Sequence, residues 1–162
     1  MDHLWSPWRY QYVTTAEAAT DCIFCTLPAA HRDAENFIVY RARLNFVILN
    51  RFPYTSGHLM VVPYEHKPTL DQVSPPALTE MILLGRRAET LLRACYRPDG
   101  LNVGINIGRA AGAGVAGHIH MHVLPRWVAD ANFMTTAGET RVLPEDLPVT
   151  FEKLSHGWNE IA

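Results

Sequence analysis

The sequence lacks the long apolar run that a membrane helix needs. No segment approaches the ~18 consecutive uncharged apolar residues that can span a bilayer. The first residues, 1–5, carry neither the basic region nor the apolar core of a secretory signal. We therefore expect neither a membrane protein nor an exported one.

The sequence also lacks an excess of charge of one sign. Lysine and arginine number 14 against 16 aspartates and glutamates, which gives a formal net charge of -2. Proteins that coat nucleic acid or an anionic membrane surface need a basic excess, because they bind through phosphate groups. The composition therefore predicts no nucleic-acid partner and no membrane partner.

Cysteine is scarce. Three cysteines are too few, and odd in number, for a disulfide framework. Cys95 fits a small buried apolar residue, whereas Cys22 and Cys25 have the Cys-x-x-Cys spacing of metal or redox chemistry in a reducing compartment. The cysteine content predicts a cytoplasmic protein.

The sequence does contain enough apolar material for one core. Its 162 residues are 48% hydrophobic and 19% charged, and two cores in a chain of this length would each be marginal. We therefore expect a single domain over residues 1–162. Residues 1–21 show no period and are expected to form an N-terminal arm, and residues 128–162 a C-terminal extension with a short helix near 145–154.

Strand patterns recur along the chain. Branched apolar runs separated by turn-forming residues predict antiparallel strands over 37–40, 46–49 and 58–62. Alternation of apolar and other residues predicts two more strands, over 101–107 and 118–124.

A helical pattern lies between the third and fourth of these strands. Ser74 followed by Pro75 is a typical helix start, and the helix is expected to end at Pro98-Asp99-Gly100. Apolar residues recur between them at intervals of three and four: Leu78, Met81, Ile82, Gly85, Ala88, Leu92 and Cys95. We expect Gly85 to let this helix lie close to a sheet. The whole pattern predicts an α+β fold with an antiparallel sheet.

The most informative segment is 117–127, which holds three histidines at alternate positions. Successive strand residues point to opposite faces, so His118, His120 and His122 share one face. Such imidazoles need hydrogen-bond partners and repel one another when charged, which makes a merely polar face the weaker interpretation. Two functional interpretations remain: a metal site with histidine ligands, and nucleophilic catalysis by one imidazole.

A glycine-rich loop precedes the histidines. Residues 106–117 include four glycines and mostly small side chains, so backbone N–H groups can close around an anion. Such a loop alone is weak evidence, since it also serves as a flexible connection. Directly before the histidines, it favours phosphate chemistry.

The motif His-x-His-x-His-x-x-Pro over 118–125 resembles that of the histidine triad family of nucleotide hydrolases and transferases. Asn50-Arg51-x-Pro53 and Gly57-His58-x-x-Val61-x-Pro63 are similar to its nucleoside-binding strands and turn. Three segments are similar to the bacterial branch that includes diadenosine tetraphosphate phosphorylases: Trp5-Ser6-Pro7-Trp8-Arg9, Pro125-Arg126-Trp127 and Asn132-Phe133-Met134. The resemblance implies a HIT-like fold with an antiparallel sheet of about five strands, one long helix and short helices, and a homodimer.

The resemblance also implies covalent catalysis. In this family the middle histidine, here His120, attacks the α-phosphorus of a nucleotide, and water or phosphate then resolves the nucleotidyl-histidine. His122 would stabilise charge on the α-phosphate in the transition state, and His58 would support His120. The implied nucleotide-binding residues are Asn50 for the ribose hydroxyls, and Asn106, Gly112 and Gly114 for the phosphate oxygens.

One part of the loop departs from the family pattern. Many members carry a polar pair such as Gln-Ser or Gln-Thr before the triad, whereas residues 113–117 are Ala-Gly-Val-Ala-Gly. Backbone donors must then replace that side-chain contact to the leaving group. The favoured substrate is a dinucleoside polyphosphate. The alternatives are an amine leaving group, as in a nucleoside phosphoramidase, and a non-catalytic nucleotide-binding zinc module.

The cysteine pair stays open between zinc, redox chemistry and chance. A strand typically precedes a redox pair, and the polar, alanine-rich residues 14–21 fit this poorly. In zinc-carrying family members, two histidines complete the site, and they correspond here to His66 and His118, with His58 as the rival. A Cys₂His₂ set is closed, so this zinc would be structural. No organic cofactor is expected.

Overall fold

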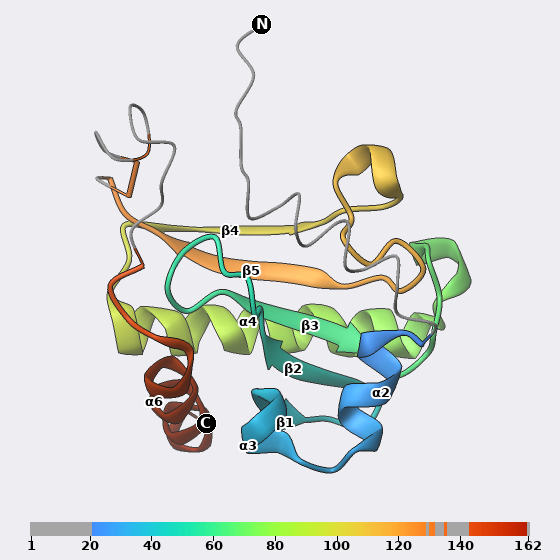
Figure 1. Ribbon diagram of the computed structural model, residues 1–162, viewed down its shortest axis with the longest axis horizontal. Helices are drawn as coiled ribbons and strands as arrows, with labels where there is room; N and C mark the ends of the chain where they lie inside the picture. Colours follow the sequence, from blue (N-terminus) through green and yellow to red (C-terminus); the bar gives the residue numbers. More distant parts are fainter. Residues whose placement is uncertain (1–20, 129, 132–134, 136–142, 162) are drawn as a thin grey trace, which may run out of the picture.

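The computed structural model describes residues 21–128, 130, 131, 135 and 143–161. Its centre is a five-stranded antiparallel sheet in the order β1-β2-β3-β5-β4 (Figure 1). The strands are β1 (Ile38–Arg41), β2 (Asn45–Leu49), β3 (Leu59–Pro63), β4 (Gly100–Ile105) and β5 (Met121–Arg126). This sheet, with one long helix and several short ones, confirms the predicted α+β fold.

Side chains alternate between the two faces of the sheet. One face packs against the helix α4 (Pro75–Tyr96), behind the sheet in Figure 1, and consists of Val47, Leu49, Leu59, Val61, Met121 and Val123. The opposite face, formed by Phe46, Ile48, Met60 and Val62, contacts Phe24 of α2 (Ile23–Ala29). Met60 of β3 is paired with His122 of β5. Because directly paired residues point to the same face, His122 lies on the α2 side.

The ends of α4 agree with the sequence prediction. The helix begins with Pro75 after Ser74 and ends before Arg97, whose left-handed backbone (φ 46°) precedes Pro98. Its buried stripe consists of Ala77, Met81, Leu84, Gly85, Ala88, Leu91 and Leu92. Ile82, predicted on this stripe, is 62% exposed, because at about 100° per residue its side chain lies about 120° around the axis from the centre of the buried stripe.

Gly85 brings α4 close to β5. A Cβ added at Gly85 would lie 2.6 Å from Cε of Met121. A larger residue would therefore displace that methyl group or move the helix away from the sheet. The close approach expected from the sequence is confirmed.

The largest differences from the predicted boundaries are at the start of β5 and the end of the C-terminal helix. The first ladder residue of β5 is Met121, and the segment before it follows another course, since the Ile119 N–H donates to the Lys67 carbonyl at 2.7 Å. The C-terminal helix α6 (Leu147–Glu160) extends beyond 145–154. It begins where the Asp146 carboxylate accepts the Val149 N–H, a typical N-cap.

The helix α6 packs against α4 and β1 and buries Leu154 and Trp158. Trp158 stacks on Tyr40 of β1, with ring centroids 5.2 Å apart. Arg87 of α4 donates to the Trp158 and Ile161 carbonyls at the end of α6, where a cation is favourable. The C-terminal helix is therefore fixed to both layers of the fold.

The remaining elements are short: α3 (Asp33–Asn36) and the 3₁₀ turns η1 (Leu70–Gln72) and η2 (Arg109–Ala111). Within the described ranges, no helix has the length and apolarity to cross a bilayer. Nearly all of the predicted arm, 1–21, lies outside the described residues, as do the motif segments 5–9 and 132–134. The division of the chain into one domain therefore stays a prediction.

Candidate active site

The three triad histidines lie at the start of β5, on the sheet face that α2 covers. His122 lies within β5, and His120 and His118 precede it at alternate positions. The ring centroids of His120 and His122 are 4.9 Å apart. His118, His120 and His122 are 0%, 4% and 9% exposed, so their ring nitrogens need partners within the protein. These partners give each ring a different chemical character.

A hydrogen bond to the main chain fixes the tautomer of His120. Its Nδ1 lies 2.9 Å from the carbonyl oxygen of His118, and because a carbonyl oxygen can only accept, Nδ1 carries the proton. Burial lowers the pKa of His120, although the hydrogen bond to His118 opposes this. The ring is therefore neutral at pH 7, and the lone pair on Nε2 is available as a nucleophile.

Two further hydrogen bonds fix the tautomer of His122. The Tyr54 backbone N–H donates to Nδ1 of His58 at 3.2 Å, so neutral His58 carries its proton on Nε2. That Nε2 lies 2.9 Å from Nδ1 of His122, which must accept. The proton of neutral His122 is then on its own Nε2. His122 consequently offers an N–H donor, whereas His120 offers a lone pair.

The charge state of His122 suits this donor role. Burial, and then the proximity of His120, lower the pKa of His122 to about 4. The ring is therefore neutral at pH 7. A neutral imidazole N–H can bind a developing negative charge on a phosphate oxygen without placing a buried cation beside His120.

The position of His58 follows from the sheet register. His58 lies two residues before Met60, which pairs with His122, so the two histidines are diagonal neighbours on one face. The family resemblance predicts that His58 supports His120, and His58 is also the rival metal ligand. Its hydrogen bond runs to His122, and the four residues that gather as possible metal ligands do not include it.

Asn50 lies beside His58 at the end of β2. Its backbone N–H donates to the His58 carbonyl at 2.9 Å, and its Nδ2 lies 3.4 Å from His58 Nδ1. Its Oδ1 accepts the Phe52 N–H at 3.0 Å. The structure thus brings the residue predicted for ribose binding next to the His58–His122 pair.

The glycine loop joins β4 to the triad segment. Ile105, the last residue of β4, pairs with Met121, so Asn106 leaves the sheet at the level of His120. Positive φ angles at Gly108 (80°) and Gly112 (90°), which favour glycine, turn the chain around η2 and on to Gly114.

Two hydrogen bonds within this loop involve backbone N–H groups near the predicted phosphate site. The Gly112 N–H donates to the Arg109 carbonyl at 2.9 Å, and the Ala113 N–H donates to the Gly108 carbonyl at 3.3 Å. The Gly112 donor is therefore engaged within the turn. Phosphate binding by Asn106, Gly112 and Gly114 stays a prediction.

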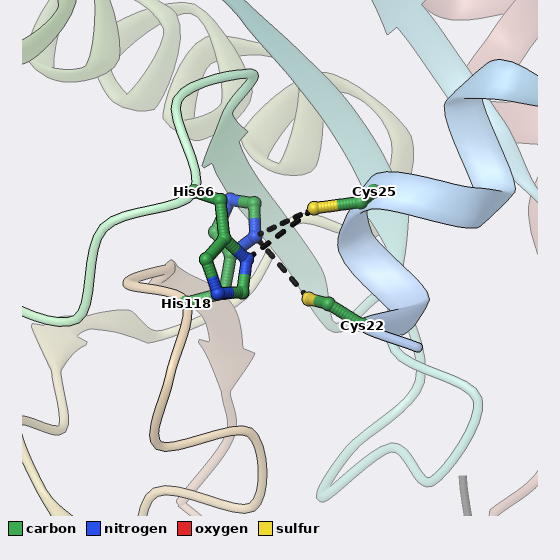
Figure 2. Close-up of side chains that lie close together, drawn as sticks. All are labelled: Cys22, Cys25, His66 and His118. Atoms are coloured by element: carbon green, nitrogen blue, oxygen red, sulfur yellow. Dashed lines mark hydrogen bonds between the residues drawn. The ribbon is translucent and has the colours of Figure 1, made fainter. Parts of the chain in front are cut away.

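The four predicted metal ligands gather at one end of the sheet. Figure 2 shows both cysteines at the start of α2, His66 on the loop after β3, and His118 just before β5. One possible ligand atom from each of Cys22, Cys25, His66 and His118 lies within 4.8 Å of the others. Residues nearly a hundred positions apart in sequence thus form one compact Cys₂His₂ set.

The spacing of these atoms fits zinc. A tetrahedral centre with bonds of about 2.3 Å to sulfur and about 2.0 Å to nitrogen separates a sulfur from a nitrogen by about 3.5 Å. The Cys22 Sγ lies 3.4 Å from His118 Nδ1, and the Cys25 Sγ lies 3.3 Å from His66 Nδ1 and 3.7 Å from His118 Nδ1. The residues therefore fit a closed structural site, in which a zinc ion would cross-link α2 to the two histidine segments.

The protonation of His118 also suits a metal ligand. Its Nε2–H donates to the Pro63 carbonyl at 2.8 Å, so the lone pair on Nδ1 faces the sulfur atoms. Burial, followed in size by the proximity of Cys22, raises the pKa of the Cys25 thiol. Two adjacent thiolates therefore require a cation to be stable here.

Sequence reasoning missed one residue of this region. Phe24, between the two cysteines, is 3% exposed. Its ring lies 4.9 Å from the His120 ring and 5.5 Å from the His118 ring, measured between centroids. The only signal in the sequence was an aromatic residue inside Cys-x-x-Cys, which does not say what the ring contacts.

Comparisons with known proteins agree with this geometry. The HIT domain family model matches residues 31–128. An AP-4-A phosphorylase of Mycobacterium tuberculosis is 36% identical over 98% of this chain and 85% of its own length. A bis(5'-nucleosyl)-tetraphosphatase (asymmetrical) of Schizosaccharomyces pombe is 31% identical over 57% of this chain and 50% of its own length.

A solved structure is similar over most of the chain. The zinc-bound histidine triad family protein of Mycobacterium smegmatis superimposes with a TM-score of 0.70 at 30% identity, covering 86% of this chain and 94% of its own. This similarity confirms the HIT-like form of the fold. A family match over more than half of the chain, and a relative 36% identical over nearly all of it, lead to one conclusion: the chain belongs to the histidine triad (HIT) family.

Proposed function

We propose that this HIT-family chain is an enzyme that cleaves dinucleoside polyphosphates, such as diadenosine tetraphosphate, at an α-phosphorus. The observation that carries the proposal is the hydrogen bond from His120 Nδ1–H to the His118 carbonyl. It leaves Nε2 of a buried neutral ring with a lone pair, as a nucleophile requires. The other triad nitrogens carry a proton, accept the His58 N–H or face the cysteine sulfur atoms.

The reaction has two steps. The Nε2 lone pair of His120 forms a bond to the α-phosphorus, and the bond from that phosphorus to the bridging oxygen breaks, with its electron pair leaving on ATP. Water or inorganic phosphate then attacks the adenylyl-histidine, the N–P bond breaks, and its electron pair returns to Nε2. The released product is AMP with water or ADP with phosphate.

The neighbouring groups support the same chemistry. The His122 Nε2–H, oriented through His58, would stabilise charge on a non-bridging phosphate oxygen, an effect that is typically large in a buried site. Asn50 would bind the ribose hydroxyls next to His58. Asn106, with the backbone near Gly112 and Gly114, would bind the remaining phosphate oxygens.

The names of the relatives support the substrate class. One relative acts on AP-4-A as a phosphorylase and another is an asymmetrical bis(5'-nucleosyl)-tetraphosphatase. Because these two names imply different second acceptors, the proposal includes phosphate and water as alternative groups that resolve the intermediate. A structural zinc at Cys22, Cys25, His66 and His118 is part of the proposal, as is a cytoplasmic location.

We also propose a homodimer that joins two sheets through β4. This strand is at one edge of the sheet, and its Val103 side chain is 56% exposed. An open edge strand pairs readily with another strand. Analytical ultracentrifugation of wild type and Val103→Lys tests this: a dimer that the substitution weakens is expected, and a wild-type monomer would contradict it.

Product analysis tests the proposed activity. Diadenosine tetraphosphate is incubated with the zinc-loaded protein, with and without inorganic phosphate. ADP plus ATP would identify phosphorolysis, and AMP plus ATP hydrolysis. His120→Ala should abolish turnover, whereas His156→Ala, which changes an exposed histidine of α6, should not. Turnover of an adenosine phosphoramidate but not of the tetraphosphate would instead identify an amine leaving group.

A further inference from the structure

We infer that Phe24 is a positioning residue that holds the His120 imidazole in its reactive orientation, and that the metal site in turn holds Phe24. The inference rests on the proposed nucleophilic role of His120. It assigns a function to the apolar residue between the two cysteines, and it connects the metal site to the rate of nucleotidyl transfer.

The first observation is the position of Phe24 between the two sites. It occupies the first turn of α2, with Cys22 and Cys25 on either side in the chain. Its ring is buried in the apolar cluster with Ile38, Phe46, Ile48, Met60 and Val62. One aromatic ring thus contacts the nucleophile and the metal ligand His118 at once.

The second observation is the arrangement of contacts around His120. The His118 carbonyl oxygen lies 2.9 Å from His120 Nδ1. The Phe24 ring lies against the His120 ring, with centroids 4.9 Å apart and planes inclined at 48°. The His122 ring, inclined at 76° and with its centroid also 4.9 Å away, lies against another part of the imidazole. These three contacts together restrict rotation about the Cβ–Cγ bond, which sets the direction of the Nε2 lone pair.

The third observation is that the Cys₂His₂ set lies at the first turn of α2. The hydrogen bonds that Asn36 and Arg41 donate to α2 are at its other end, on the Leu27 and Pro28 carbonyls. This element is a seven-residue helix whose N-terminal Cys22 forms no side-chain capping bond, and helices this short are marginal on their own. The two cysteines place the first turn of α2 within 3.4 Å of a ring nitrogen of His118 and 3.3 Å of one of His66. A metal bound there would therefore fix the position of Phe24 against His120.

The physical consequence concerns the rate of adduct formation. A nucleophile must approach phosphorus in line and at close range, and a displacement of about 1 Å can lower the rate on the order of a hundredfold. Loss of the ring should therefore lower the rate of adduct formation at saturating substrate.

Single-turnover kinetics on zinc-loaded protein test the inference. Phe24→Ala and Phe24→Leu should lower the rate of adenylyl-histidine formation on the order of 10- to 100-fold, with one zinc still bound per chain. Phe46→Leu is the matched control, because Phe46 belongs to the same apolar cluster but its ring contacts Tyr64, with centroids 5.3 Å apart. A Phe24 variant that folds, binds zinc and forms the adduct at the wild-type rate would overturn the inference.

A readout independent of activity is the ¹⁵N spectrum of the imidazoles. In zinc-loaded wild type, His120 should show one tautomer with the proton on Nδ1, and removal of zinc or Phe24→Ala should produce a mixture of tautomers or a broadened signal. An unchanged His120 signal in both cases would contradict the inference. Failure of the proposed function is distinguishable, because wild-type protein would then form no adduct at all.

Discussion

Nε2 of His58 lies 2.9 Å from Nδ1 of His122, and the proton between them belongs to His58. This follows because Nδ1 of His58 already accepts the Tyr54 N–H. The turn between β2 and β3 thereby determines which nitrogen of His122 is available as a donor. The central chemistry of the site depends on this orientation.

Replacement of His58 should therefore impair catalysis through His122. His58→Phe removes the donor to Nδ1 and should lower kcat roughly 10- to 100-fold, because His122 can then adopt the wrong tautomer. His58→Gln retains an amide donor and should lose less. Steady-state kinetics check this, and equal kcat values for wild type and His58→Phe would show that His58 does not control the tautomer of His122.

Acid should destabilise the fold through His122. Its pKa is about 4 in the folded chain against an ordinary value of 6.5, so between these values the unfolded chain binds more protons. This contribution to stability is present above about pH 6.5 and is lost as the pH falls towards 4.

Urea unfolding at about pH 7 and about pH 5 measures this loss. The free energy of unfolding of wild type should fall by about 2 kcal/mol more than that of His122→Asn, which lacks the titrating group. The zinc content is measured at both values as a control. An identical pH dependence in the two proteins would show that His122 is not buried as a neutral ring.

The metal site predicts a defined stoichiometry. Wild type should contain about one zinc per chain, because the Cys₂His₂ set is closed and its atoms have tetrahedral spacing. Cys25→Ser should lose the metal and lower Tm by roughly 5–10 °C. Cys95→Ser changes the remaining cysteine, which lies outside the set, and should keep both. Elemental analysis that finds no bound zinc in wild type would reject the site.

Gly57, next to His58, should tolerate no side chain. Its φ of +79° disfavours L-residues, and an added Cβ would lie 3.0 Å from Tyr96 Cε2 and 3.2 Å from Leu92 Cδ2. Gly57→Ala should lower the free energy of unfolding by about 1–3 kcal/mol, as measured in urea. Gly100→Ala is the control, since an added Cβ there meets no heavy atom within 4 Å; equal losses would refute the steric argument.

Local patterns in the sequence predict the positions of strands and helices well. They predict less well which side of a helix is buried. Alternation and turn residues locate all five strands to within a few positions, and Ser74-Pro75 locates the start of α4. Ile82 fits an apolar spacing equally well, yet faces solvent. Only packing against the sheet decides which side of a mostly apolar helix is buried.

The site contains relationships that no local pattern encodes. Period two places the triad on one face, but the pairing of His58 with His122 depends on the register between β3 and β5. The contact of Phe24 with His120 depends on how α2 docks. Of the Cys₂His₂ set, the Cys-x-x-Cys spacing indicates the two cysteines, whereas His66 and His118 could be predicted only from the family resemblance. All four meet in space, although they come from segments distant in the chain.

The most direct test of the account is rapid-quench capture of the covalent intermediate. Zinc-loaded protein is mixed with diadenosine tetraphosphate labelled at the α-phosphates, quenched, and digested for peptide mapping. The account predicts an acid-labile adenylyl group on the peptide that contains His120, which forms before product and is absent from His120→Ala. Product formation with no labelled protein at any time, or label on another residue, would contradict it.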